Sequence, residues 1–284
     1  MTSFFKKTLS GLFALTVLSL SVFAEPGFNV WGSGKVFKLD PLTDGILLGT
    51  GVLLSGGDLL LDNVMELNRG KYNPAEIYNK DNINGFDRPF MKSYNKKLDN
   101  CADLTLALSM AAPCVLAATD KEEWLTVGVM YAETLLIANG AKELSKLAIN
   151  RARPYVYFDS EKPEEDLKDG DWNNSFPSGH STMAFAGAAF STYTFAKYFP
   201  ESNWKYAVAA GSYSLAVATA GLRMASGNHF ASDVCAGAVL GTGIGLLVPW
   251  LHTFNQNNDL KIATDGTGVS FIYRPGSAVK KTGL

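Results

Sequence analysis

A histidine at the start of an apolar stretch is the first residue of this chain that could do chemistry. Residues 175–180 read SFPSGH, and apolar residues follow. Pro177 suits the turn before a helix or its first turn. The backbone N–H groups of Ser178, Gly179 and His180 would then point out of a helix N-terminus, where an anion is stabilised. His180 can also donate a proton near neutral pH. A phosphate site explains this set, but so does an ordinary helix cap with a chance histidine.

A second histidine, His229, has an arginine six residues before it and a carboxylate four residues after it. On a helix, His229 and Asp233 would face the same way. A carboxylate bonded to one imidazole nitrogen fixes the tautomer and makes the other nitrogen a better nucleophile or base. Arg223 offers a fork of donors that matches phosphate oxygens. A buried His–Asp pair beside a surface arginine is the structural alternative.

Basic residues gather where an earlier apolar stretch ends. Lys146 and Arg153 are seven residues apart, which is about two helical turns, so both can lie on one face. Pro154 follows directly, so a helix should end there. Cations in a last turn complement the helix dipole. That effect explains one cation better than the set of Lys146, Arg151 and Arg153.

The apolar stretches between these groups decide whether the groups can meet. Five stretches follow one another, at 104–118, 124–141, 181–196, 206–222 and 234–251. They are rich in Ala and Gly and lack period-2 alternation, which favours helices over strands. In an antiparallel bundle, the basic group ends one helix at the same end where His180 begins the next. Two further helices lead out and back to His229. We therefore expect an all-α antiparallel helical bundle with the active site at one end.

Together the three groups resemble the three-part signature of the type 2 phosphatidic acid phosphatase superfamily, which also includes bacterial acid phosphatases and vanadium haloperoxidases. The matching segments are Lys146-x6-Arg153-Pro154, Pro177-Ser178-Gly179-His180 and Arg223-x5-His229-x3-Asp233. Their order and spacing agree throughout, and the resemblance covers roughly residues 100–250. One departure is Leu222, where the family usually has serine, which removes one hydrogen bond but no charge.

The resemblance implies a phosphatase that works without a metal. His229 would attack phosphorus and form a phosphohistidine, Asp233 would orient it, and His180 would protonate the leaving alcohol. The phosphoryl oxygens would be held by Lys146, Arg153, Arg223 and the backbone amides of Ser178 and Gly179. We find neither a carboxylate cage for Mg²⁺ nor a Zn²⁺ triad, so we expect no metal and no other cofactor. His252, at the far end of the last stretch, is expected to be structural or interfacial.

The expected substrate is an exported lipid phosphate or pyrophosphate of the phosphatidate, isoprenyl phosphate or lipid A type, or a small phosphomonoester. A soluble periplasmic acid phosphatase of the same superfamily is the main alternative. A vanadium-dependent haloperoxidase fits less well, because such enzymes usually have longer chains. A non-catalytic membrane protein with this fold is opposed by the complete set of charged and histidine groups.

Charge and cysteine content exclude other classes. The 284 residues include 25 basic and 27 acidic side chains, for a net charge of -2, so no basic field for nucleic acid exists. Cys101, Cys114 and Cys235 show no metal spacing, and their odd number opposes a disulfide framework. We expect small buried core residues, and a Cys101–Cys114 bridge stays open.

The chain divides into four expected parts. Residues 1–24 have the pattern of a secretory signal peptide, with two lysines, an apolar core and small residues before Glu25. Residues 25–100 form an N-terminal segment with one apolar helix at 45–61 and a polar loop with short helices. Residues 101–254 form the catalytic helical bundle, and 255–284 a tail in which a short hairpin is expected.

The lengths of the apolar stretches do not decide whether the bundle crosses a membrane. The five stretches are 15 to 18 residues long, at or just below the length that crosses about 30 Å of hydrocarbon. Their small residues suit the close helix packing of membrane bundles. We favour a bundle embedded in the inner membrane, with its site facing the periplasm and 45–61 re-entrant or lying against the bundle. A wholly soluble periplasmic enzyme is the alternative.

Overall fold

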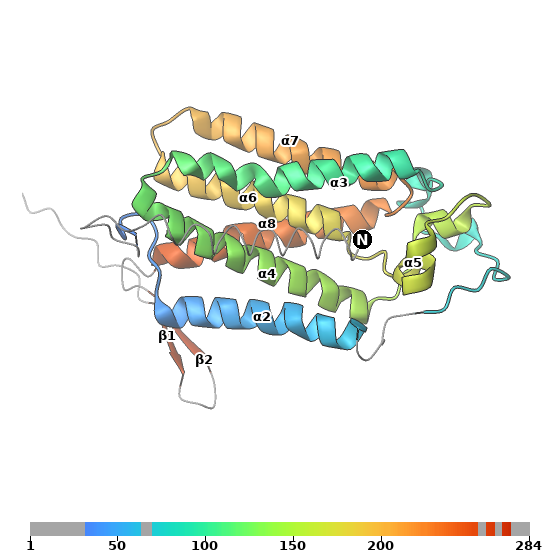
Figure 1. Ribbon diagram of the computed structural model, residues 1–284, viewed down its shortest axis with the longest axis horizontal. Helices are drawn as coiled ribbons and strands as arrows, with labels where there is room; N and C mark the ends of the chain where they lie inside the picture. The colour runs from blue at the N-terminus through green and yellow to red at the C-terminus, as the bar shows by residue number, and fades with distance from the viewer. Residues whose placement is uncertain (1–31, 64–69, 255–259, 265–268, 274–284) are drawn as a thin grey trace, which may run out of the picture.

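Long antiparallel helices make up the fold (Figure 1). The computed structural model describes residues 32–63, 70–254, 260–264 and 269–273, so the expected signal peptide lies outside the described residues. The bundle helices are α2 (Pro41–Asn63), α3 (Lys96–Ala111), α4 (Trp124–Ala148), α6 (Gly179–Tyr198), α7 (Trp204–Ala225) and α8 (Ala231–Phe254). The shorter elements are α5 (Glu164–Asp169) and the 3₁₀ turns η2 (Lys80–Asn82), η3 (Arg88–Phe90), η4 (Ala112–Ala118), η5 (Lys121–Glu123), η6 (Pro154–Tyr157) and η7 (Asp171–Asn173).

The predicted fold class is confirmed. The five apolar stretches form α3 with its 3₁₀ extension η4, then α4, α6, α7 and α8. The expected hairpin is present as β1 (Leu260–Thr264) and β2 (Val269–Tyr273), which pair antiparallel. Among the residues that the structure describes, two stretches, Lys96–Ala118 and Ala231–Thr253, are long and apolar enough to cross a membrane, by length and composition alone.

The stretch at 45–61 belongs to α2, one continuous helix that lies against α4. A Cβ on Gly140 of α4 would lie 2.3 Å from the Cβ of Leu54, so these helices are in contact because Gly140 has no side chain. The re-entrant form of the prediction is therefore wrong, and the packed form is right. The helix begins at the far end of the bundle, where Asp44 Oδ1 lies 2.8 Å from His252 Nε2.

The central helix α6 is held against α8 by a row of glycines. A Cβ on Gly237, Gly241 or Gly245 would lie 2.6, 2.0 or 2.5 Å from a backbone carbonyl oxygen of α6. These glycines are four residues apart and so share one face of α8. Since Gly237 touches the carbonyl of Ser178, the contact fixes the start of α8 against the start of α6.

Helix α3 begins earlier than the apolar pattern suggested. The side chain of Asn95 caps it by accepting the N–H groups of Lys97 and Leu98 at 3.1 Å each. Its first turns carry Asp99 and Asp103 and are polar, so hydropathy alone missed them.

The expectation of buried cysteines is wrong. Cys101, Cys114 and Cys235 are free and exposed. They lie on outward faces of helices, where an apolar sequence context does not distinguish a core position from the surface of a bundle.

Candidate active site

Backbone hydrogen bonds tie the three sequence groups together at one end of the bundle. Arg151 N donates to the carbonyl of Asn173 at 2.9 Å, and Ser175 N donates to the carbonyl of Arg151 at 2.9 Å. Thus the segment after α4 runs beside the segment before α6. Tyr155 N donates to the carbonyl of Gly227 at 3.1 Å, which joins the first segment to the loop between α7 and α8.

The loop that carries His229 turns sharply at Gly227. This glycine has φ +75°, and a Cβ there would lie 2.6 Å from the carbonyl oxygens of Lys92 and Ser93. His229 is 2 % exposed, and its Nδ1 lies 2.7 Å from the carbonyl oxygen of Ser175. A carbonyl only accepts, so Nδ1 carries the proton and Nε2 presents a lone pair.

Asp233 does not contact His229 as the sequence led us to expect. Its nearest oxygen is 3.8 Å from His229 Nδ1, beyond hydrogen-bond distance. The carboxylate instead accepts the hydroxyl of Ser175 at 2.6 Å and the N–H of Phe230 at 2.8 Å. Asp233 therefore holds both segments that position His229, and the carbonyl of Ser175 orients the ring directly.

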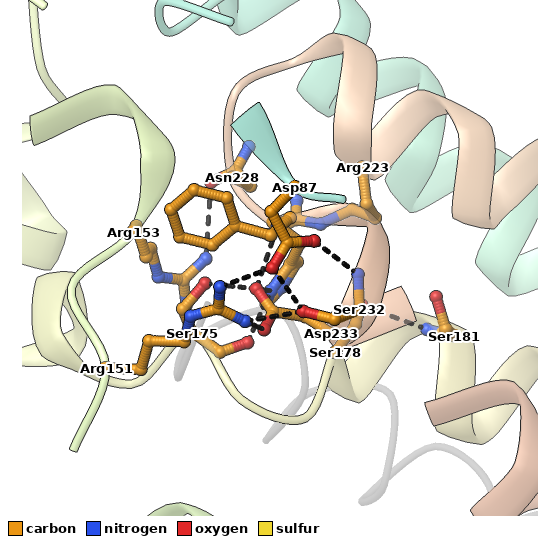
Figure 2. Close-up of polar contacts among 12 residues, drawn as sticks. Asp87, Arg151, Arg153, Ser175, Ser178, Ser181, Arg223, Asn228, Ser232 and Asp233 are labelled. Carbon is orange, nitrogen blue, oxygen red and sulfur yellow. Dashed lines mark hydrogen bonds and ion pairs between the residues drawn. The ribbon is translucent and has the colours of Figure 1, made fainter. Parts of the chain in front are cut away.

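Behind Asp233 lies an ion-pair network that sequence analysis missed, shown in Figure 2. Arg151 donates to Asp233 Oδ1 at 2.5 Å and to Asp87 Oδ2 at 2.6 Å. Asp87 is fully buried and also accepts the N–H and hydroxyl of Ser232 at 2.8 and 2.7 Å. Burial raises the pKa of Asp87, but hydrogen bonds from Ser232, Arg151 and Asn84 outweigh it and leave the pKa below its usual value.

Two of the expected cations lie on one side of the site. Arg153 is 1 % exposed and donates to the carboxylate of Asp171 at 2.7 Å and to Asn228 Oδ1 at 3.3 Å. Lys146 is 4 % exposed and pairs with Glu143 at 3.3 Å. Although burial raises the pKa of Asp171, the charges of Arg153 and Lys146 hold it well below its usual value. These cations therefore share one charged cluster.

The third cation, Arg223, comes from the end of α7. It is 3 % exposed and donates through Nη1 to Asp99, which also accepts Asn228 Nδ2 at 3.0 Å. Its Nε is buried and has no hydrogen-bond partner within the described part of the chain. Such a buried donor costs about 1–3 kcal/mol. A bound anion would remove that cost, so this nitrogen points to a ligand.

His180 has a partner from α3. Its Nε2 lies 2.7 Å from Asp103 Oδ1. Burial and the charge of Arg223 lower the pKa of His180 to about 4, and the hydrogen bond and charge of Asp103 offset part of this shift. The sequence motif contains no residue of α3, and Asp103 was missed.

The amides at the start of α6 divide differently from the expectation. Ser178 N donates to the carbonyl of Asp233 at 3.0 Å, so this amide already has an acceptor, and its assignment to a phosphoryl oxygen is wrong. The Ser178 hydroxyl caps α6 by accepting Ser181 N at 3.4 Å. Gly179 and His180 stand in the first turn, where the helix provides no acceptor. Lys142 packs against Gly179, with its Cδ 3.2 Å from a Cβ built there.

The pKa of His229 reflects its burial and its charged surroundings. Burial lowers its pKa well below the usual 6.5, and Arg153, Arg223 and His180 lower it further, in that order. The backbone hydrogen bond from Ser178 N to the carbonyl of Asp233, 3.0 Å long, holds the start of α6, which carries His180, against the start of α8, which follows His229. The ring of His229 is neutral at pH 7.

The sequence did not predict four carboxylates of the site, which come from segments outside the three motifs. They are Asp87, Asp99, Asp103 and Asp171. All four lie in polar sequence, where acidic residues usually face solvent. The spacing of Asp99 and Asp103, one turn apart at a capped helix start, was the one signal available.

The three motif segments lie within the part of the chain that matches a known family. Residues 127–257 match the sequence profile described as the PAP2 superfamily. A lipid A 1-phosphatase of Porphyromonas gingivalis is 29% identical over 180 residues, which cover 63% of this chain and 34% of that protein. The chain thus matches about a third of the length of this curated relative. A transmembrane PAP2 type phosphatidylglycerolphosphate phosphatase from Bacillus subtilis aligns with a TM-score of 0.42 and 18% identity, over 74% of this chain and 95% of that chain.

Proposed function

Because the chain belongs to the type 2 phosphatidic acid phosphatase (PAP2) superfamily, we propose that it is a phosphatase that hydrolyses lipid phosphomonoesters or pyrophosphates without a catalytic metal. The arrangement of His229 carries this proposal. Its proton is held at Nδ1 by the carbonyl of Ser175, so Nε2 is free to act as a nucleophile. Three buried cations, Lys146, Arg153 and Arg223, provide charge for a phosphoryl group.

In the first step, His229 Nε2 attacks phosphorus in line with the leaving oxygen. The N–P bond forms as the P–O bond of the ester breaks, and the leaving oxygen takes a proton from His180. Asp103 supports this role because its carboxylate, together with the negative charge of a bound phosphate ester, opposes the burial and the Arg223 charge that lower the pKa of His180. Arg223 Nε and the amides of Gly179 and His180 are the donors that fit the phosphoryl oxygens.

In the second step, water attacks the phosphohistidine. His180, now neutral, accepts a proton from the water as the new P–O bond forms and the N–P bond breaks. Inorganic phosphate leaves, and both imidazoles return to their starting protonation states.

A single-turnover experiment tests the intermediate. Purified enzyme is mixed with ³²P-labelled substrate, quenched in alkali, and separated by gel electrophoresis, because phosphohistidine survives base and is lost in acid. Label should appear on the wild-type chain and be absent from His229→Gln. Label of equal intensity on His229→Gln would refute the nucleophile.

A lipid substrate is supported by the outer surface of the bundle. Leu104 on α3, Val217 on α7 and Val239 on α8 are 61%, 60% and 75% exposed, and apolar exposure of this kind suits contact with lipid. The name of the curated relative supports the same class. To test it, kcat/KM should be compared for lipid A, phosphatidate, an isoprenyl pyrophosphate and p-nitrophenyl phosphate in mixed micelles. A lipid should be preferred, and equal values for all four would favour the soluble acid phosphatase.

We also propose that the site faces the periplasm, the compartment to which residues 1–24 would direct the chain. If the bundle crosses the bilayer, this requires the start of α2 to lie in the cytoplasm, because Asp44 is at the end opposite the site. A leader cleaved before Glu25 would leave that start in the periplasm. A cleaved leader and a periplasmic site are therefore compatible only in a bundle that does not cross.

A further inference from the structure

We propose that Asp44, Glu133 and His252 bind a divalent metal ion such as Zn²⁺ at the end of the bundle opposite the phosphatase site. One ligand atom from each residue lies within 4.8 Å of the other two. The three residues come from the start of α2, the first half of α4 and the end of α8. The sequence led us to expect no metal and a structural or interfacial role for His252.

The hydrogen bond at the back of His252 sets the chemistry of its other nitrogen. Nδ1 lies 2.8 Å from the carbonyl oxygen of Val248, so Nδ1 carries the proton. In a neutral ring, Nε2 then presents a lone pair to Asp44 Oδ1 at 2.8 Å and Glu133 Oε2 at 3.3 Å. A lone pair and two carboxylates repel one another unless a proton or a metal ion lies between them, and a single proton would offset only one of the two negative charges. Metal-bound histidines are oriented in this way by a backbone carbonyl or carboxylate on the second nitrogen.

The burial of Glu133 is a second, independent observation that indicates a bound cation. Its side chain is 0 % exposed, and within the described chain neither carboxylate oxygen has a hydrogen-bond partner. Neither Asp44 nor Glu133 forms an ion pair with a lysine or arginine among the described residues. The imidazole of His252, 3.3 Å from Glu133 Oε2, can offer at most one positive charge to the two carboxylates, so the buried carboxylate of Glu133 is poorly compensated, which is destabilising. A divalent ion would neutralise both carboxylates at once.

The ligand types identify the class of metal. Mg²⁺ and Ca²⁺ prefer sites made only of oxygen, whereas imidazole with carboxylates suits Zn²⁺ and its neighbours. Two ligands bound tetrahedrally to Zn²⁺ at about 2.0–2.1 Å lie about 3.3 Å apart. The separations of 2.8 and 3.3 Å from His252 Nε2 are within about half an ångström of that value, and the two carboxylate oxygens lie within 4.8 Å of each other.

The site is separate from the phosphatase machinery. His252 follows Asp233 by 19 residues on α8, which is about 28 Å of helix. An ion here would join α2 to α4 and α8, in addition to the hydrogen bonds of Ser55 on α2 with Leu136 and Asn139 on α4. Its role is therefore to fix the end of the bundle, with no part in the phosphoryl transfer.

Metal analysis of the full-length protein tests the assignment. Purified enzyme in detergent is incubated with Zn²⁺ alone, dialysed against metal-free buffer, and analysed by mass spectrometry. Wild type should retain about one equivalent. Glu133→Gln preserves shape and removes the charge, and it should reduce zinc to background, as should His252→Gln.

Two control variants separate this site from others. Glu123→Gln removes a buried carboxylate that already accepts hydrogen bonds from Ser33 and Tyr198, and it should retain the ion. His229→Gln should also retain it, which excludes the phosphatase site. Cobalt-loaded wild type should show visible d–d absorption, a measurement that does not depend on any variant folding. Wild type without zinc and without the cobalt spectrum would overturn the proposal, and so would zinc retained by folded Glu133→Gln.

Discussion

The imidazole Nδ1 of His229 is held by the backbone carbonyl of Ser175 at 2.7 Å. The neighbouring carboxylate of Asp233 lies 3.8 Å from the same atom and bonds instead to the Ser175 hydroxyl. Asp233 thus acts on the histidine through Ser175, as a positioning residue. This arrangement separates the effects of substitutions at the two positions.

Replacing His229 with Gln should abolish turnover, because no other side chain supplies the nucleophile. Replacing Asp233 with Asn should lower kcat less, by about 10–100-fold, since residues that orient a functional group through another residue typically have effects of this size. Steady-state kinetics with a phosphomonoester measure both. An Asp233→Asn enzyme as inactive as His229→Gln would contradict an indirect role.

Replacing Asp103 with Asn should weaken His180 as a proton donor. The carboxylate that favours the charged ring is lost, so the rate should fall most for substrates with poor leaving groups. Comparing an alkyl phosphate with p-nitrophenyl phosphate measures this dependence. The double variant with His180→Gln should be no slower than His180→Gln alone. Additive losses would mean that Asp103 acts elsewhere.

Replacing Arg223 with Lys should reduce both turnover and inhibition by vanadate. The charge is kept, but the fork that reaches Asp99 through Nη1 while leaving Nε unpartnered is lost. Wild type should be inhibited by micromolar vanadate, which adopts the geometry of the transferring phosphoryl group. Inhibition curves for both enzymes provide the measurement. Equal inhibition would show that Nε does not contact the anion.

Acid should destabilise wild type more than His229→Gln between pH 7 and 5. Burial and nearby cations hold the folded pKa of His229 well below 6.5. As pH falls through 6.5, the unfolded chain binds a proton at this ring while the folded chain does not, so the free energy of unfolding decreases. Urea midpoints at pH 7.5 and 5.0 should therefore fall further for wild type. The other histidines are common to both proteins and serve as the internal control.

Cysteine labelling should decide the membrane side. Two exposed residues mark the ends of the bundle: Glu165 belongs to α5, which lies at the end of the site, and Lys121 lies just before α4, which begins at the opposite end (Figure 1). In a variant lacking the three native cysteines, a membrane-impermeant maleimide should label Glu165→Cys in cells with a permeabilised outer membrane. Lys121→Cys should be protected if the bundle crosses, and labelled if the bundle lies wholly in the periplasm. Labelling of Lys121→Cys alone would place the site in the cytoplasm and overturn the proposal.

The sequence by itself determined which helices form and which motif residues lie at one end of them. Apolar stretches of helical length, separated by polar breaks, allow few antiparallel arrangements. The order of the stretches along the chain then places His180 and His229 at the same end of the bundle. The sequence also predicted that His252 lies at the opposite end, but it did not predict that Asp44 and Glu133 would lie beside it there.

Only the tertiary structure decided which groups touch the histidines. The carbonyl of Ser175 orients His229, and a backbone carbonyl has no sequence signature because every residue has one. Asp87 and Asp103 lie 142 and 77 residues before the histidines they serve. In polar segments such carboxylates look like ordinary surface residues. Their burial depends on packing between distant segments, which local hydropathy does not encode.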